Sequence, residues 1–365
     1  MKILLLGEYS NVHNTLAKGL RQLGHEVTVA SNGDFWKDYP RDQDLARRMG
    51  KLGGLKLMAK VATLLPRWRG YDVVQLINPM FLELKAEHIF PIYRYLRRHN
   101  RHIVLCAMGM DYYWVKECVE KKPLRYSDFN IGDKLRTIEC AMTDRNDWMN
   151  TAKGKLNKMI AEECDAIVTG LYEYDVCYRP NFPQKTTFIP LPINPGNFSS
   201  PSGPGKPFTL FIGISKNRNI YKGTDIMLRA AQTVKKKYPD RLELKVVDGV
   251  PFAQYQQMMN DSDVIMDQLY GYTPAMNALL AMSKGIVVIG GGEPESYDIL
   301  GEQELRPIIN VEPSYESVYE QLELLVLHPE RLLLLKQQSI DFVKKHHDYM
   351  KVARKYESLY TTLTS

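Results

Sequence analysis

Two basic side chains come just before a predicted helix in the second half of the chain, and their spacing could bind an anion. Arg218 and Lys222 follow a strand-like run that ends at Ile212, and Thr224 is the expected N-cap of the helix. Cations at this end of a helix are unfavourable by roughly 0.3–1 kcal/mol, because the helix dipole is positive there. An anion between them would offset that cost, since each charge-assisted hydrogen bond contributes roughly 1.5–3 kcal/mol. The motif therefore predicts a phosphate site.

A second predicted helix in the same half could also present its first turn to a ligand. Thr273 is its expected N-cap, Pro274 its first residue, and Gly285 ends it after a nearly uninterrupted apolar run. Such a helix must be buried, so its first backbone N–H groups need a partner other than bulk water. That partner is either an anionic or polar ligand, or Thr273 with a tight turn alone. Asn277, within the run, is either a ligand contact or a structural hydrogen-bonding residue, and the structural role is slightly favoured.

A glycine-rich turn with two acids follows the next predicted strand. Gly290 to Gly292 would let a ligand approach the backbone, and Glu293 and Glu295 supply carboxylates beside it. Turns of this composition also occur at ordinary protein surfaces. Because this turn lies at the carboxyl end of a strand in the same half as Lys222, ligand binding is the preferred interpretation.

In the first half of the chain, polar residues follow two predicted strands. Glu8 and His13 come directly after the first strand, without the spaced glycines of a dinucleotide-binding turn, which argues against a nicotinamide or flavin enzyme. His13 could contact a substrate or form a hydrogen bond at a helix start, and a lone histidine more often does the latter. Gly109 and Asp111 follow a later strand, where Asp111 could bind sugar hydroxyls or stabilise a turn.

The elements that must position these residues are strands and helices in alternation. Short apolar runs alternate with helical patterns, which is typical of parallel sheets covered on both faces. We expect strands at 2–6, 26–30, 72–77, 103–106 and 166–169, and again at 208–212, 242–247, 264–267, 286–289 and 308–310. A helix over 14–23 should end at Gly24.

Prolines and glycines between Ile189 and Pro207 interrupt this alternation and divide the chain. We therefore predict an α/β protein with two Rossmann-like, doubly wound domains that face a shared cleft, where open α/β sheets bind ligands. The first domain covers 1–195 and the second 205–345. A final helix over 346–365 could cross back to the first domain.

The composition limits the class of protein. With 365 residues and 44% hydrophobic residues, the chain can form two cores. No apolar run is long enough to cross a bilayer, and 1–7 is too short and too soon polar for a secretory signal. Five cysteines without paired close spacing favour reduced thiols, so we expect a cytoplasmic protein without a zinc site. Asp261 and Asp263 resemble a chelating pair but enter the amino end of a strand, so no metal is expected.

The segment from Leu45 to Gly70 is basic and lacks acids, although the net charge of the chain is a modest +6. Apolar residues are interleaved with its lysines and arginines, which is consistent with peripheral contact with an anionic membrane. The default alternative is a solvated face over a core-facing stripe, and Gly53 and Gly54 weaken a continuous helix. No nucleic-acid partner is expected.

At these residues the chain resembles the retaining nucleotide-sugar glycosyltransferases of the GT-B fold (group 1, family 4-like), which build bacterial polysaccharides. In that family an arginine shortly before a Lys-Gly pair binds the donor diphosphate, and Arg218 and Lys222 match in type and order. The other matches are the strand at 263–267, the Ala-Met helix end at 281–285, the glycine-rich turn at 292–295, His13, and Gly-His-Glu-Val at 24–27.

One family feature is missing. The family carries two glutamates separated by seven residues, the second immediately before Ala-Met, and here Tyr272 and Leu280 occupy those positions. Leucine cannot accept hydrogen bonds from a ribose. Either Glu293 or Glu295 takes over this task, or the nucleotide is held differently, or the protein has lost donor binding.

The resemblance implies a glycosyltransferase that moves a sugar, with retention, from a nucleoside-diphosphate sugar to a glycan or lipid-linked acceptor, with the first domain on the acceptor side. In the family's mechanism the departing phosphate can itself take the acceptor proton, so catalysis rests on stabilising the leaving diphosphate without a metal. The catalytic residues implied are Arg218, Lys222, His13 and Asp111. The residues expected to bind the nucleotide sugar are Thr273, Asn277, Gly292, Glu293, Glu295 and Glu8.

Two alternatives stay open. The chain could be a non-catalytic GT-B-like protein that binds a glycan or a partner enzyme and has lost donor binding, for which Leu280 is the best support. It could also be a nucleotide-sugar epimerase of similar architecture, which would convert the donor without any acceptor.

Overall fold

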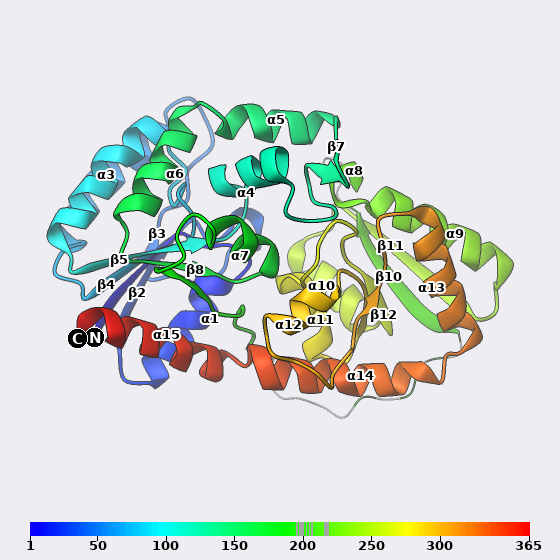
Figure 1. The fold of residues 1–365 in the computed structure, drawn as a ribbon. Helices are drawn as coiled ribbons and strands as arrows, with labels where there is room; N and C mark the ends of the chain where they lie inside the picture. Colours follow the sequence, from blue (N-terminus) through cyan, green and yellow to red (C-terminus); the bar gives the residue numbers. More distant parts are fainter. Residues whose placement is uncertain (195, 197–200, 202, 204, 206, 215–218) are drawn as a thin grey trace. The chain divides into compact units, whose positions relative to one another are not determined.

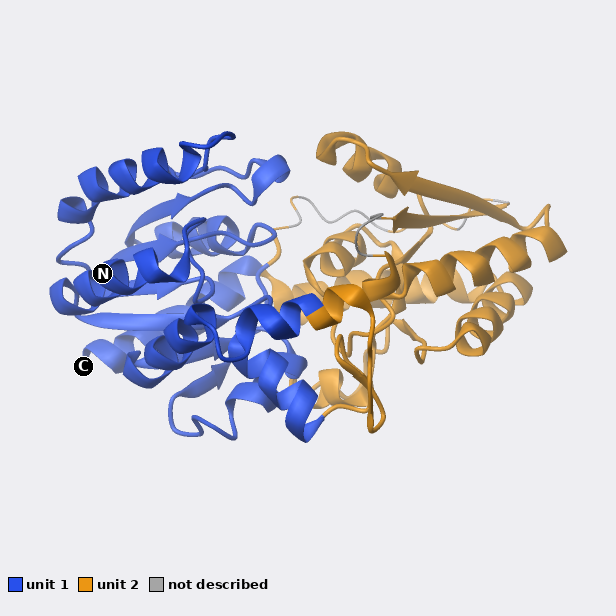
Figure 2. Ribbon diagram, turned by 90° about the horizontal axis from the view of Figure 1, so that it is seen from above, with its two compact units in different colours: residues 1–123, 143–192, 349–365 blue, residues 124–142, 193–348 orange. Residues whose placement is uncertain are grey.

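The structure is a computed structural model that describes residues 1–194, 196, 201, 203, 205, 207–214 and 219–365. The chain forms two compact units, coloured separately in Figure 2. Unit 1 consists of Met1–Pro123, Thr143–Pro192 and Tyr349–Ser365, and unit 2 of Leu124–Met142 and Ile193–Asp348. Residues 124–142 thus belong to unit 2, although unit 1 sequence flanks them on both sides.

Unit 1 is built on a parallel sheet whose strand order is β3-β2-β1-β4-β5-β8-β9. The strands are β1 (Lys2–Leu6), β2 (Glu26–Ser31), β3 (Gln43–Asp44), β4 (Val73–Leu76), β5 (His102–Ala107), β8 (Ala166–Thr169) and β9 (Thr186–Phe188). The five strands expected in this half are present, with ends within one residue of the prediction. The edge strands β3 and β9 were not predicted, because they are short and carry polar residues instead of an apolar run.

Helices cover both faces of this sheet (Figure 1). Helices α1 and α15 lie on one face, and α3 and α6 lie on the other. The helices are α1 (Val12–Gln22), α2 (Gly53–Leu64), α3 (Ala86–His99), α4 (Tyr112–Lys116), α5 (Glu139–Trp148), which runs from unit 2 into unit 1, α6 (Ala152–Glu163), α7 (Tyr172–Tyr178) and α15 (Tyr349–Thr364). A main hydrophobic core lies between the sheet and helices α2, α3 and α6.

Helix α1 begins two residues earlier than predicted, because Asn11 adopts a left-handed conformation (φ 72°) and starts the helix at Val12. Gly24 follows its end with φ 87°, as a glycine after a helix C-terminus commonly does. Helix α1 packs closely on α15: a Cβ added at Gly19 would lie 2.6 Å from the Cβ of Ala353 and 2.9 Å from the carbonyl oxygen of Tyr349. This contact holds the last helix on unit 1.

Unit 2 has a second parallel sheet, with the order β11-β10-β12-β13-β14. Its strands are β10 (Phe208–Ile214), β11 (Leu242–Asp248), β12 (Val264–Met266), β13 (Val287–Gly290) and β14 (Ile309–Asn310). They match the five strands predicted for this half to within two residues. Its helices are α8 (Asn219–Lys222), α9 (Thr224–Lys237), α10 (Phe252–Asn260), α11 (Met276–Ser283), α12 (Pro294–Asp298), α13 (Tyr315–Leu327) and α14 (Arg331–Phe342).

The core of unit 2 lies largely between its sheet and the packed helices α9 and α13. Residues 124–142 add a small antiparallel hairpin, β6 (Asn130–Ile131) and β7 (Lys134–Leu135). Both units are therefore parallel sheets covered by helices, and the predicted α/β class is confirmed. Within the described ranges, no helix is both long enough and apolar enough to cross a bilayer.

Candidate functional site

The predicted phosphate-binding turn lies after strand β10, and the structure describes its second half. Arg218 lies outside the described residues. Lys222 ends the short helix α8, and its carbonyl oxygen accepts a hydrogen bond from the backbone N–H of Leu269 at 2.9 Å. Gly223 follows with φ 75° and packs so closely that a Cβ there would lie 2.7 Å from that of Leu269. The Lys-Gly pair therefore sits in a tight turn directly before α9.

The predicted cap of this helix is wrong by one residue. Gly223, not Thr224, is the N-cap of α9, and Thr224 is the first helical residue. The left-handed conformation of Gly223 lets the chain turn into the helix without a side-chain cap. The hydroxyl of Thr224 instead donates to the carbonyl oxygen of Asn219 at 3.4 Å.

The second predicted helix start is also displaced. Helix α11 begins at Met276, with Ala275 as its N-cap, so Thr273 and Pro274 precede the helix instead of opening it. Thr273 is buried. The side-chain amide of Asn277 donates to the Asp267 carboxylate at 3.0 Å and to the Tyr255 hydroxyl at 3.2 Å. Asn277 therefore forms structural hydrogen bonds within unit 2, which is the alternative that the sequence slightly favours.

The glycine-rich turn lies at the carboxyl end of β13, as predicted, and is held firmly. The backbone N–H of Gly292 donates to the side chain of Asn310 at 2.9 Å, and that of Glu293 donates to the carbonyl oxygen of Tyr272 at 3.2 Å. A Cβ at Gly291 would lie 2.0 Å from the carbonyl oxygen of Gly271. The glycines therefore allow close approach of another stretch of backbone, the 271–272 loop.

Both acids of this turn are bound by side chains of unit 2. The guanidinium of Arg125 donates to the Glu293 carboxylate at 2.6 Å and forms a two-pronged ion pair with Glu295. Glu293 also accepts hydrogen bonds from the hydroxyl of Tyr126 and from Asn310. No local motif in the sequence marks Arg125, which lies far from these acids along the chain.

Arg125 also binds Tyr272, which occupies the position of the family's first glutamate. The Tyr272 hydroxyl accepts the backbone N–H of Arg125 at 2.7 Å, and the guanidinium lies 5.0 Å from the centre of the ring. Tyr272 is buried. Partial burial by itself would raise the pKa of the Glu295 carboxyl, but the hydrogen bonds and the charge of Arg125 lower that pKa below its usual range. The negatively charged form of Glu295 is therefore favoured.

In unit 1, Glu8 and His13 are both buried at the start of α1. The Glu8 carboxyl accepts the backbone N–H groups of His13 at 3.2 Å and Asn14 at 2.8 Å. Burial nevertheless raises the pKa of Glu8 to about 8, since desolvation outweighs these bonds. Burial lowers the pKa of His13 to about 4, so its imidazole is neutral near pH 7.

The hydrogen bonds of His13 fix its tautomer. Nδ1 lies 2.8 Å from the carbonyl oxygen of Gly7 and must donate to it, so Nε2 accepts from the side-chain amide of Gln75 at 3.1 Å. The Gln75 oxygen in turn accepts from the Tyr360 hydroxyl at 2.6 Å. His13 thus connects the first loop, strand β4 and helix α15, which corresponds to the hydrogen-bonding alternative for this residue.

Asp111 is likewise buried and bonded within unit 1. It is the N-cap of α4, accepting the backbone N–H of Trp114 at 2.8 Å, and it accepts the Tyr178 hydroxyl at 2.7 Å. Burial raises the pKa of Asp111 to about 6. A contact between Asp111 and a ligand stays a prediction, and the geometry shows the turn-stabilising alternative.

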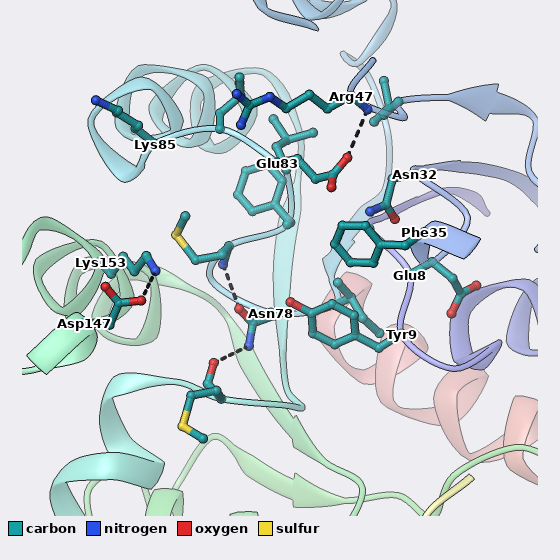
Figure 3. A pocket seen from close by; sticks show the side chains of 18 of the residues that line it. Glu8, Tyr9, Asn32, Phe35, Arg47, Asn78, Glu83, Lys85, Asp147 and Lys153 are labelled. Carbon is teal, nitrogen blue, oxygen red and sulfur yellow. Dashed lines mark hydrogen bonds and ion pairs between the residues drawn. The ribbon is translucent and has the colours of Figure 1, made fainter. Parts of the chain in front are cut away.

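Glu8 borders a pocket of about 560 Å³ in unit 1 (Figure 3). The loops after β1, β2, β3, β4 and β5, the second half of α5 and the start of α6 supply its walls. Its polar side chains include Asn32, Asn78, Glu83 and Lys85, and its apolar wall includes Phe35, whose residue is 61% exposed.

Several lining groups of this pocket are already ordered. Asn78 accepts the backbone N–H of Met80 at 2.9 Å and donates to the carbonyl oxygen of Met108 at 2.8 Å. Lys153 and Asp147 form an ion pair at 2.7 Å on the side of the pocket away from Glu8 and Phe35 in Figure 3. Amides, charged groups and an exposed ring together could bind a hydroxylated ligand with an apolar face. Among the described residues, no three His, Cys, Asp or Glu side chains gather as a metal site would require.

The predicted site residues therefore fall into two groups. Thr273, Asn277, Gly292, Glu293, Glu295 and Lys222 lie in unit 2, and Glu8, His13 and Asp111 lie in unit 1. Within unit 2, the structure brings Glu293 and Glu295 together on one arginine. Their roles in ligand binding and catalysis stay predictions.

Comparison with known proteins gives a match at the level of fold. No family model matches the sequence, and no curated protein matches it. Among solved structures, sucrose-phosphate synthase from Thermosynechococcus elongatus superposes with a TM-score of 0.65 at 13% identity, covering 100% of this chain and 99% of that chain. The Anabaena protein HepE, solved with UDP and glucose, gives 0.62 at 12% identity, with 99% and 100% covered.

The catalytic domain of starch synthase IV from Arabidopsis thaliana, bound to ADP and acarbose, gives a TM-score of 0.59 at 11% identity, with 100% and 99% covered. These alignments span essentially the whole of both chains, so they include both parallel sheets described above. The GT-B fold that the resemblance implied is thereby confirmed, and the chain has the same two-Rossmann-domain fold as these glycosyltransferase structures.

Proposed function

We propose that this chain is a glycosyltransferase that moves a hexose-type sugar from a nucleoside-diphosphate sugar to a glycan or lipid-linked acceptor, with retention, in surface polysaccharide synthesis. The main support is that the GT-B fold extends over the whole chain. Structures of the same fold were solved with nucleotides, including HepE with UDP-glucose. The Lys222–Gly223 turn, placed after strand β10, matches in sequence the family's diphosphate-binding motif.

The donor would be bound by unit 2. Lys222, with Arg218, would neutralise the diphosphate as the sugar bond breaks, which lowers the barrier because negative charge grows on the leaving group. The departing phosphate would take the proton of the acceptor hydroxyl, so no side-chain base or metal ion is required. This fits a site where the buried His13 and Asp111 are held in structural hydrogen bonds.

The acceptor would be bound by unit 1, in the pocket beside Glu8. Its amides and charged groups suit sugar hydroxyls, and Phe35 offers a ring face for a sugar to stack on. A glycan could therefore form hydrogen bonds through its hydroxyl groups and stack one sugar face on Phe35.

A surface of unit 1 that carries basic and apolar residues supports peripheral binding of the protein to an anionic membrane on the cytoplasmic side. Helix α2 buries Leu57 and Val61 in the core, but Leu52 and Leu55 are 59% and 62% exposed. Exposed basic residues flank them in the sequence: Arg47, Arg48, Lys51 and Lys56. Apolar insertion combined with attraction to anionic lipid is the usual basis of peripheral binding.

A second candidate is a GT-B-like binding protein without transferase activity. Tyr272 and Leu280 replace the two family glutamates, and Glu293 and Glu295 are already engaged by Arg125. Such a protein would bind a glycan or a partner enzyme but no nucleoside diphosphate.

Calorimetry with a panel of nucleoside diphosphates separates these candidates. The transferase should bind at least one of them, and with the corresponding donor it should release free sugar slowly and transfer it to an acceptor, also in the presence of EDTA. If no nucleotide binds at millimolar concentration, the transferase proposal fails. Conversion of the donor to its epimer without an acceptor would instead identify an epimerase.

A further inference from the structure

Residues 124–142 contact two turns of unit 2 that are both predicted to bind the donor, the Lys222 turn and the Glu293–Glu295 turn. Arg125, at one end of the segment, binds the acids of the glycine-rich turn. Arg136, at the other end, donates to the carbonyl oxygens of Ile220 at 2.9 Å and Tyr221 at 3.2 Å, in helix α8, which ends at Lys222. One short segment thus contacts both turns through arginines.

Arg136 is buried, and its positive charge is stabilised by carbonyl oxygens and by an aromatic ring. Its guanidinium lies 3.6 Å from the centre of the Tyr270 ring, and it also donates to the carbonyl oxygens of Ser127 and Asp128 at 3.3 Å. Carbonyl groups at the end of helix α8 carry partial negative charge, which a cation stabilises. Breaking these contacts would leave a buried charge without compensation.

The segment between the two arginines is ordered by its own hydrogen bonds. The side-chain amide of Asn130 donates to the carbonyl oxygens of Leu124 at 2.9 Å and Gly132 at 3.0 Å. The backbone N–H of Arg136 donates to the carbonyl oxygen of Phe129 at 2.8 Å. Tyr126, Phe129 and Asn130 are buried. These bonds and this burial tie the two arginines into one ordered segment.

We infer that residues 124–142 are a brace that holds the Lys222 turn and the Glu293–Glu295 turn in one fixed geometry, with Arg125 and Arg136 as positioning residues. This inference rests on the donor site proposed above. Arg125 also balances charge: without it, two carboxylates would stand uncompensated in a site for an anionic diphosphate, where like charges weaken binding.

Hydrogen exchange of the ligand-free protein tests the brace without relying on activity. The protected amides to follow are those of Gly292 and Glu293 in one turn, and that of Leu269, which is bonded to the carbonyl of Lys222. In Arg125→Ala, exchange should accelerate at Gly292 and Glu293 and also at Leu269. Unchanged exchange at Leu269 would overturn the inference, because the two turns would then be held independently.

Calorimetry with UDP supplies the second readout. Arg125→Ala should weaken UDP binding about tenfold or more. Arg125→Lys should recover part of the loss, since lysine restores the charge but not the two-pronged ion pair.

Arg97→Ala is the matched control, because Arg97 forms a comparable two-pronged ion pair with Asp165 in unit 1. This variant should leave both hydrogen exchange and UDP binding unchanged. Equal or tighter UDP binding by Arg125→Ala would overturn the brace. If the unaltered protein binds none of the nucleoside diphosphates, the donor proposal fails, and hydrogen exchange alone decides the brace.

Discussion

Glu8 accepts the backbone N–H of His13 at 3.2 Å, and burial moves the pKa values of these two neighbours in opposite directions. The pKa of Glu8 rises from 4.5 to about 8, and that of His13 falls from 6.5 to about 4. Both side chains are consequently neutral in the folded protein near pH 7, and both contribute to the dependence of stability on pH.

Between pH 6.5 and 8, the free energy of unfolding should fall as the pH rises. Over this window the folded protein keeps most of a proton on Glu8 that the unfolded chain has lost. The unfolded chain still holds part of a proton on His13 near pH 6.5, which offsets only a small part of the Glu8 effect. Between pH 4.5 and 6.5 the two residues have opposite effects, because the unfolded chain then holds the extra proton on His13. The net loss from pH 6.5 to 8 should be about 1–1.5 kcal/mol.

Urea denaturation at pH 6.5 and 8 of the unaltered protein and of Glu8→Gln measures this effect. Glutamine cannot ionise, so the variant should lose much less stability over the window, whatever its stability at pH 6.5. An identical pH dependence in both proteins would show that Glu8 does not titrate there.

Gly19→Ala should destabilise unit 1 by about 1–3 kcal/mol, because the added methyl group would collide with Ala353 and with the backbone of Tyr349 in α15. Gly54→Ala is the matched control: it also lies in a helix, but the nearest atom to its added Cβ is a guanidinium nitrogen of Arg47 at 3.8 Å. That variant should be neutral or stabilised by up to about 1 kcal/mol through helix propensity. Thermal unfolding of both variants checks the prediction, which equal melting temperatures would contradict.

Lys222→Ala should reduce turnover with the correct donor by about tenfold or more, equivalent to roughly 1.4 kcal/mol of transition-state stabilisation. The reason is that the leaving diphosphate would lose a positive charge placed next to it. Lys236→Ala, an exposed lysine near the end of α9, serves as the control. Turnover of Lys222→Ala at the rate of the unaltered protein would remove Lys222 from the proposed mechanism.

Replacing Leu52 and Leu55 together by aspartate should abolish sedimentation with vesicles that contain anionic lipid. The double variant removes apolar side chains from the surface and adds negative charge beside the basic residues. Leu333 and Leu334 in α14 are exposed to similar extents, 48% and 63%, and their replacement by aspartate should change nothing. If the unaltered protein does not sediment with such vesicles, the membrane part of the proposal is wrong.

The sequence by itself determined the α/β class and most of the strands. Buried parallel strands such as β1 and β10 are continuous apolar runs between polar stretches, and this local signal is strong enough to place their ends to within two residues. The first residues of the helices are predicted less accurately from the sequence than the ends of the strands. Left-handed residues such as Asn11 and Gly223 turn the chain into α1 and α9, and backbone conformation of this kind is only weakly encoded in a single residue type.

Only the tertiary structure decided which groups the predicted site residues bind. The pairing of Arg125 with Glu293 joins residues 168 positions apart, so no local pattern could reveal it. The same holds for His13, whose partners Gln75 and Tyr360 come from a distant strand and from the last helix. Spacing along the chain predicts which residues lie at the ends of strands. Tertiary packing alone determines whether the polar groups of those residues bind other protein groups or can bind a ligand.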